Sequence, residues 1–446
     1  MASEPTLTFG VELEFLIATN SSHENNKETY ETMASLFLEN LANPLPCACI
    51  QGKWSKYKDS SVVGSKDSTT LQAEGKSAVG LEVSTRVLKF DKQGCPEFRA
   101  AFTAITKGGH LKNNNVAGIF KPVPTQNAAV HVHIGVENGL DLDTAKKAVA
   151  LGWLLEPCLF SLCSGDRGRL THAPIRKYSV LANKKIAIEE SDAKKELNGD
   201  GVTRGENGID KNLDDGVPND THKDIQGDSN IFEKAENTPR REQDGEDVLN
   251  QKDESNVTHG YFSKGGKSRV TTQEEVPQKI PELGSCNLPI EFSTIERKRI
   301  STILAAKDMY ELEILISSTH AISTNRRLSL AIYNREDDHT TIEFRHFQST
   351  MDNELAWRWV RITAAIVQTA SKPKSEYSET LQFIAKEYDT MKLKWTEHIW
   401  DRTFRRETTD PWLNSWQWML ILLDLEDDIP FWRDHLSQLP ERNRTT

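Results

Sequence analysis

Acidic and imidazole side chains recur at alternate positions in three segments of this chain. The three pairs are Glu12 with Glu14, His131 with His133, and Glu343 with Arg345. Successive side chains of a β-strand point to opposite faces, so residues two apart share a face. Carboxylates and imidazoles on one face can converge on a divalent cation, and an arginine beside a carboxylate suits a site that holds metal ions and phosphate together. The pairs therefore predict metal or phosphate chemistry.

Each pair also has a structural explanation, which spacing alone leaves open. Two glutamates on one strand face repel each other, and a protein tolerates this in water as well as around a cation. Two histidines also fit a solvated strand face, and Glu343 with Arg345 also fits an ordinary salt bridge. The arrangement of all three pairs in space decides between these interpretations.

The strands that must position these residues are predicted from their apolar side chains. Alternating apolar residues predict five strands, at 7–17, 78–86, 128–136, 328–333 and 341–347. The second strand adds Glu82, a lone carboxylate among apolar neighbours, as a further candidate ligand. Antiparallel packing of these strands would bring the charged residues onto one concave face.

Helical spacing of apolar residues predicts the elements that cover the sheet. Helices are predicted at 27–39, 97–106, 143–162 and 353–369. Asp143 is the predicted N-cap of the third helix, while residues 312–317 fit either a strand or a helix. The sequence thus predicts an α+β fold with an antiparallel sheet and flanking helices.

The composition changes sharply in the middle of the chain. Residues 189–282 are mainly Asp, Glu, Lys, Asn and Gly, and such a segment cannot bury enough apolar area to offset its ordering entropy. We therefore expect a disordered polar insertion that separates a first part of a catalytic domain, 1–188, from a second part, 283–372. The Trp-rich region 373–446 is expected to form C-terminal helices whose tryptophans belong to the core.

Charge and composition exclude several classes of partner. The chain has 446 residues and a formal net charge of -11, which gives no electrostatic reason to expect nucleic acid. Neither a secretory signal nor a membrane span is expected, and six cysteines without zinc-type spacing fit reduced thiols. The expected location is cytoplasmic, and the oligomeric state remains open.

The candidate ligands also indicate which ion they would hold. Oxygen ligands with one or two imidazoles favour Mg²⁺ or Mn²⁺ over structural zinc. Several carboxylates close together imply more than one ion, or an ion with a nucleotide phosphate, because their repulsion is otherwise uncompensated. Arg345, with Arg326 or Arg327, could then neutralise charge on a transferring phosphoryl group.

Four motifs in a fixed order carry a resemblance to a known family. They are FGVELE at 9–14, GLEVS at 80–84, VHVHIG at 130–135 and TIEFR at 341–345. This ordered set resembles the amidoligase family, which is similar to glutamine synthetase and glutamate–cysteine ligase. The resemblance implies a glutamine synthetase-like antiparallel sheet cradle and an ATP-dependent carboxylate–amine ligase. Such an enzyme forms an amide or isopeptide bond between small-molecule or peptide substrates through an acyl phosphate.

The resemblance also implies a role for each candidate residue. Metal ligands would be Glu12, Glu14, Glu82, His131, His133 and Glu343, with either histidine placed near ATP. Arg345 would steady the phosphoryl group, together with Arg326 or Arg327. Asp67, next to Ser68, resembles a family Asp-x-Ser element near the nucleotide, although Asp59 competes for this assignment.

Two alternative functions use the same residues differently. A non-catalytic, ligase-like scaffold would bind a peptide or partner, with the acidic insertion as its interaction arm. A cupin-type metalloenzyme would use His131, His133 and Glu137 around one transition metal in a small β-barrel, but it leaves Glu12, Glu14 and Glu343 unexplained.

Overall fold

The computed structural model describes the parts of the chain that form one sheet and the helices packed with it. The described residues are 5–19, 55–58, 77–92, 94–106, 121–125, 128–163, 174–183, 288–319, 328–333, 340–390 and 415–439. The chain divides into two units, and every described residue belongs to the larger one, which consists of Met1–Lys195 and Lys279–Thr446. The predicted insertion at 189–282 and the predicted helix at 27–39 lie outside the described residues.

One antiparallel sheet contains all five predicted strands. Its strands are β1 (Leu7–Thr19), β2 (Ser55–Lys58), β3 (Ser77–Ser84), β4 (Leu88–Lys89), β5 (Lys121–Val123), β6 (Ala129–Val136), β7 (Leu330–Tyr333) and β8 (Thr341–Gln348). The order across the sheet is β2-β3-β1-β6-β8-β7, and β4 and β5 also pair with β1. The neighbouring strands β6 and β8 lie some two hundred positions apart in the sequence.

The faces of the sheet follow from the alternation in its strands. Phe9, Val11, Leu13 and Phe15 of β1 are each at most 2% exposed, and β6 contributes fully buried valines and an isoleucine in the same way. Because neighbouring side chains alternate, the glutamates of β1 and the histidines of β6 must project from the opposite face. The apolar face therefore fixes which residues the other face presents.

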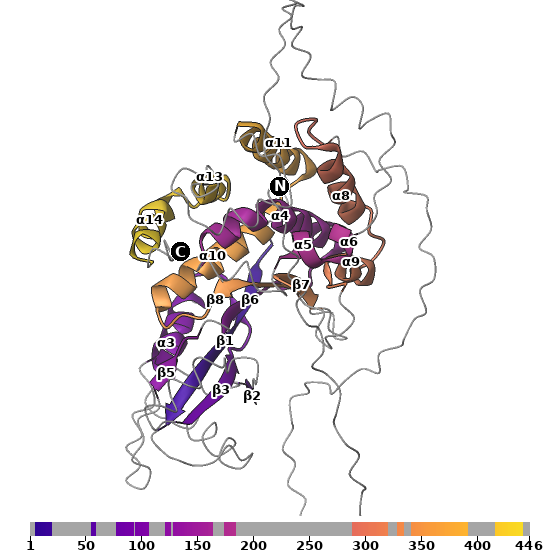
Figure 1. Ribbon diagram of the computed structural model, residues 1–446. Coiled ribbons are helices and arrows are strands. Elements are labelled where there is room, and N and C mark those ends of the chain that lie inside the picture. Colours follow the sequence, from indigo (N-terminus) through magenta and orange to yellow (C-terminus); the bar gives the residue numbers. More distant parts are fainter. Residues whose placement is uncertain are drawn as a thin grey trace, which may run out of the picture. The chain divides into compact units, whose positions relative to one another are not determined.

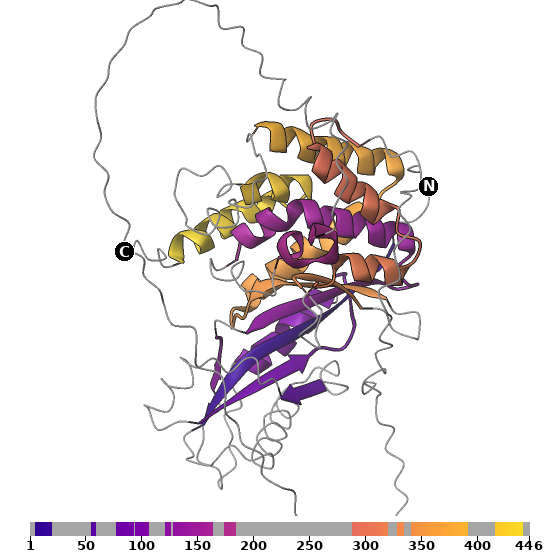
Figure 2. The same ribbon diagram turned by 45° about the vertical axis from the view of Figure 1, so that its right-hand side comes forward.

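The described helices lie on the apolar side of the sheet, some directly against it and others packed on those helices. They are α3 (Gly94–Thr106), α4 (Leu142–Ser161), α5 (Ile175–Tyr178), α6 (Val180–Asn183), α8 (Thr294–Leu304), α9 (Met309–Ile316), α10 (Asn353–Ala370), α11 (Lys374–Thr390), α13 (Ser415–Leu422), the 3₁₀ helix η3 (Glu426–Asp428) and α14 (Ile429–Gln438). In both ribbon views α4 and α10 lie directly over the sheet (Figures 1 and 2). The expected mixed fold, an antiparallel sheet with flanking helices, is confirmed. Residues 312–317, which fitted either type, lie mostly in α9.

Helix α4 differs from its prediction at its start and contains a proline. The N-cap is Asp141, not Asp143, because the Asp141 carboxylate accepts the backbone N–H of Thr144. Pro157 has no N–H, so the carbonyl of Trp153, four residues earlier, is left for another donor. The guanidinium of Arg176 donates to it at 3.0 Å, and the helix continues past the proline to Ser161.

The described tryptophans of the C-terminal region belong to the core, as the sequence predicts. Trp432 of α14 is fully buried and contacts Phe347 of β8 edge to face, with ring centroids 6.0 Å apart. Nearby, the buried carboxylate of Asp428 accepts hydrogen bonds from Arg358 and Arg361 of α10. These contacts fasten the end of the chain to the helix layer. Among the described residues, no helix is both long and apolar enough to cross a membrane.

Replacing Asp428 tests this fastening. We expect Asp428→Asn to lower the free energy of unfolding by about 2 kcal/mol, because two partly buried arginines lose their common anion. Urea denaturation measures the change. Asp424→Asn is the matched control: Asp424 is mostly exposed, lies 3.5 Å from Lys372, and has a positive φ of 56° that asparagine also tolerates. A loss no larger than that of the control would contradict the prediction.

Candidate functional site

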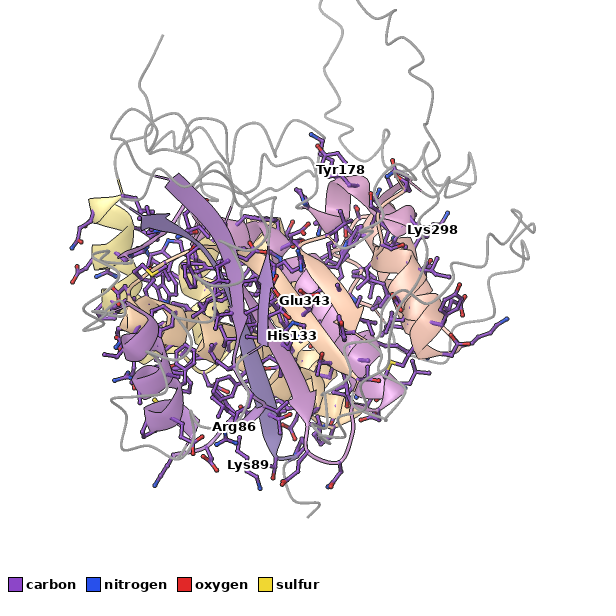
Figure 3. All side chains as sticks on the ribbon, turned by 90° about the horizontal axis from the view of Figure 1, so that it is seen from below. Arg86, Lys89, His133, Tyr178, Lys298 and Glu343 are labelled. Atoms are coloured by element: carbon purple, nitrogen blue, oxygen red, sulfur yellow. The ribbon has the colours of Figure 1, made fainter. Side chains whose placement is uncertain are left out.

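The strand register brings the charged residues together on the face opposite the helices. In the pairing of β1 with β6, Glu12 lies opposite His131. In the pairing of β6 with β8, His133 lies opposite Glu343. Seen from below, these strands run in front of the helices, with His133 and Glu343 near the middle of the sheet (Figure 3). The predicted convergence of β1, β6 and β8 is therefore present.

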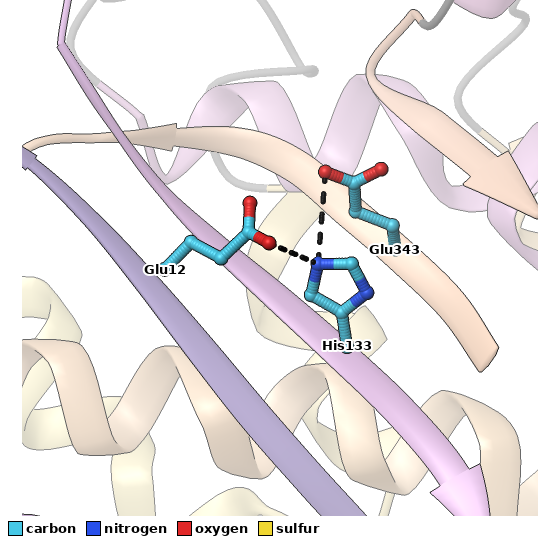
Figure 4. Close-up of side chains that lie close together, drawn as sticks. All are labelled: Glu12, His133 and Glu343. Carbon is cyan, nitrogen blue, oxygen red and sulfur yellow. Dashed lines mark ion pairs between the residues drawn. The ribbon is translucent and has the colours of Figure 1, made fainter. Parts of the chain in front are cut away.

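Three side chains from these three strands could share one cation. The Nε2 atom of His133 lies 3.2 Å from Glu12 Oε1 and 3.8 Å from Glu343 Oε1 (Figure 4). One ligand atom from each of the three residues lies within 4.8 Å of the other two. This separation suits atoms that coordinate one ion from several sides, and the set of two carboxylates and one imidazole matches Mg²⁺ or Mn²⁺.

His131 occupies a different place, between the carboxylates. Its Nδ1 atom lies 3.2 Å from Glu12 Oε2 and 3.6 Å from Glu343 Oε1, while its Nε2 atom lies 3.6 Å from Glu14 Oε1. The ring thus bridges the site residues of β1 and β8. With its side chain 2% exposed, it is held by these contacts on both sides.

Arg345 reaches into the same cluster and orients it. Its Nη1 atom lies 2.5 Å from Glu343 Oε1 and 3.2 Å from the Nδ1 atom of His131. The Nδ1 atom of His131 thus lies at hydrogen-bond distance from both the Arg345 guanidinium and the Glu12 carboxylate. The tautomer of the ring decides which of the two it bonds, because a guanidinium only donates and a carboxylate only accepts.

The surrounding cations keep two carboxylates of the site ionised. Burial alone would raise the pKa of Glu343, but Arg345, His133 and His131 outweigh it and lower the pKa to about 2. Burial also opposes ionisation of Glu12, yet hydrogen bonds with His131 and His133 hold its pKa well below the ordinary value. Both groups are therefore anionic near neutral pH and ready to bind a cation.

Neighbouring polar groups fix the orientation of the site residues. Thr341 Oγ1 lies 3.3 Å from the Nδ1 atom of His133, the backbone N–H of Ala129 donates to Glu14 Oε2 at 2.8 Å, and the hydroxyl of Ser349 donates to the carbonyl oxygen of Glu14. Sequence reasoning missed Thr341, although it lies two positions before Glu343 and so shares its strand face.

The remaining candidates fall into two groups. Glu82 lies opposite Glu14 in the pairing of β3 with β1, next to the cluster. Asp67, Arg326 and Arg327 lie outside the described residues, so their predicted roles stay predictions.

The residue that the cupin alternative requires lies elsewhere. Glu137 is exposed in the turn after β6 and pairs with Lys89 at 2.6 Å. The two histidines instead contact Glu12, Glu14 and Glu343. An open sheet with helices on one face also differs from the small barrel that this alternative implies.

A comparison with family models finds a match over the first part of the chain. Residues 5–212 match the family described as "Putative amidoligase enzyme". This confirms the resemblance found in the sequence motifs. The amidoligase match includes β1, β3 and β6, while β8, with Glu343 and Arg345, follows it in the chain. No curated protein and no solved structure matches the chain.

The low pKa of Glu343 predicts a specific loss of stability in acid. An unfolded glutamate titrates near pH 4.5, so the ionised Glu343 stabilises the folded protein above that pH, and this contribution is lost as the pH falls towards about 2. Without added metal, we expect the free energy of unfolding to fall more steeply over this window in the wild type than in Glu343→Gln. Denaturation at a series of pH values measures both slopes. Glu137→Gln, which removes an exposed carboxylate, should follow the wild type; equal slopes in all three proteins would contradict the prediction.

Proposed function

We propose that this protein is an ATP-dependent carboxylate–amine ligase that forms an amide or isopeptide bond. The observation that carries the proposal is the cluster of Glu12, His133, Glu343 and Arg345, built on the same sheet whose first strands match the amidoligase family. The cluster combines a cation site with a fixed guanidinium, and phosphoryl transfer needs both. We further propose that the sheet serves as a glutamine synthetase-like cradle.

The donor set fits a hard divalent cation. Glu12, His133 and Glu343 would hold Mg²⁺ or Mn²⁺, because ionised carboxylate oxygens are the ligands these ions prefer. Glu14 and Glu82, opposite each other on β1 and β3, could serve a second cation. When bound, such ions would neutralise the charge of the ATP phosphates and align them.

The chain's own residues would act on the phosphoryl group. In the proposed reaction, an oxygen of the substrate carboxylate attacks the γ-phosphorus of ATP, which gives an acyl phosphate and ADP. The amine then attacks the acyl carbon, phosphate leaves, and the amine nitrogen loses a proton. Although burial opposes the charged form, Glu343 and Glu14 raise the pKa of Arg345, so its guanidinium stays charged and can donate to the phosphoryl oxygens. His131 would hold that guanidinium in place through Nδ1.

Cation binding can be tested without a substrate. We expect the wild type to bind Mn²⁺, and Glu12→Gln and Glu343→Gln to weaken binding by at least about tenfold, since even outer-shell partners of a ligand typically contribute 10- to 100-fold. Isothermal titration calorimetry measures the affinity. Glu137→Gln, at the exposed turn, should bind like the wild type. Unchanged affinity in both site variants would refute the proposed cation site.

Turnover is the test of the ligase itself. With Mg²⁺ and ATP, the protein should release ADP and phosphate only when a carboxylate and an amine are both present, and mass spectrometry of a treated cell extract should detect the amide. Glu343→Gln should lower the rate by about 100-fold or more, because it removes an anionic ligand of the proposed cation and the carboxylate that holds Arg345. Its circular dichroism should match that of the wild type, and Glu137→Gln should remain active. Nucleotide binding without turnover on a broad panel of acids and amines would contradict the ligase and favour the non-catalytic scaffold.

A further inference from the structure

A buried carboxylate lies on the helix side of the sheet, away from the candidate site. Glu156 of α4 is fully buried. It accepts the backbone N–H groups of Ile175 and Arg176 at 2.8 and 3.0 Å, and the hydroxyl of Ser329 at 2.5 Å. A carboxylate removed from water needs such donors. One of these donors, the Ser329 hydroxyl, lies directly before β7.

Ser329 connects this carboxylate to the strand that carries the site. It is fully buried, and it directly precedes β7. Its side chain donates to Glu156, while its carbonyl oxygen accepts the backbone N–H of Arg345 at 2.7 Å. One residue thus joins α4 to the backbone of β8 at the position of the site arginine.

The backbone of β8 is irregular at this same position. Val132 pairs with Phe344 and Val130 with Phe347, so Arg345 and His346 together lie opposite the single residue His131. Such a bulge interrupts the hydrogen-bond ladder and redirects the side chains on the bulged strand. Here Arg345 points into the site, where it contacts Glu343 and His131.

The next residue is fixed on the other side of the sheet. His346 is fully buried, its ring lies 4.9 Å from that of Phe160, and its Nε2 atom lies 3.9 Å from Glu156 Oε1. The thiol of Cys163 lies 3.4 Å from the carbonyl oxygen of His346 and 3.2 Å from that of Leu159. Arg345 is thus held on the site face of the sheet and His346 on the helix face. Glu156 lies close to His346 and also binds Ser329, which holds the backbone of Arg345.

We propose that Ser329, held by Glu156, is a positioning residue that fixes the bulge of β8 and so aims Arg345 at Glu343 and His131. This inference rests on the proposed function, in which Arg345 contacts the phosphoryl group. The bulge interrupts the hydrogen-bond ladder between β8 and β6 at His131. On the other side of β8, the hydrogen bond from the backbone N–H of Arg345 to the carbonyl oxygen of Ser329 holds the bulged segment. Loss of the Ser329 hydroxyl frees this anchor from α4, and the guanidinium then samples orientations away from the site.

A double-mutant cycle on nucleotide affinity tests this connection. The probe is Mg²⁺ with a non-hydrolysable ATP analogue, and calorimetry measures its affinity for Ser329→Ala, Arg345→Ala and the double variant. We expect each single variant to weaken binding about tenfold, and the double variant to bind no more weakly than Arg345→Ala, because residues that act through one contact are not additive. Additive losses would mean that Ser329 acts independently of Arg345 and would overturn the inference.

The control removes a comparable hydroxyl elsewhere in the helix layer. Ser371→Ala deletes a half-buried hydroxyl that donates to Val367 within the last turn of α10, and its nucleotide affinity should equal that of the wild type. If Ser329→Ala does not fold, Ser329→Cys replaces it in the cycle, because a thiol of similar size is only a weak donor. A weakening by Ser371→Ala as large as that by Ser329→Ala would overturn the inference.

A crystal structure of Ser329→Ala separates this inference from the proposed function. We expect the Arg345 guanidinium to leave Glu343 and His131 while the histidines and carboxylates of the site stay in place. An unmoved guanidinium would overturn the inference even if the protein is a ligase. If the wild type binds no nucleotide, the proposed function fails, and this structure alone then decides the role of Ser329.

Discussion

The structure depends on the balancing of negative charge by cationic and imidazole groups on one face of an antiparallel sheet. Glu12, Glu14 and Glu343 come from two strands, and in a low-dielectric setting their repulsion would open the sheet. The strand between them supplies two imidazoles, and Arg345 supplies a cation that stays charged. Strand order is therefore an electrostatic requirement as much as a topological one: β6 must lie between β1 and β8 for the charges to balance.

The helix layer makes this balance rigid. The faces of β1, β6 and β8 that turn away from the charged residues are fully buried under α4 and α10, so a shift of register by one residue would expose that core. The cost of such a shift keeps each carboxylate opposite its imidazole. Burial on one face thus defines geometry on the other, and the buried Glu156 extends this control to the bulge in β8.

Much of this could be predicted from the sequence, because strand alternation is a strong local signal. It predicted all five strands and the shared face of Glu12 with Glu14 and of His131 with His133.

Other features depend on contacts that no local pattern contains. Asp141 and Asp143 are equally good cap residues by type, and only the turn geometry selects Asp141. Glu156 lies in α4 and Ser329 directly before β7, both in apolar segments. Their hydrogen bond is visible only once α4 packs against β7. The bulge was hidden because Phe344 and Phe347, three positions apart, face the same core.

The separation of β6 and β8 in the chain affects the order in which the protein can assemble. During synthesis the amino-terminal strands emerge first, so β6 would present an unpaired edge next to an acidic surface until β8 is made. Such an edge can pair with other chains, and its carboxylates would still lack the guanidinium. A nascent or truncated chain that ends before β8 is thus expected to rely on chaperones or to aggregate, and the sheet closes only once β8 has been made.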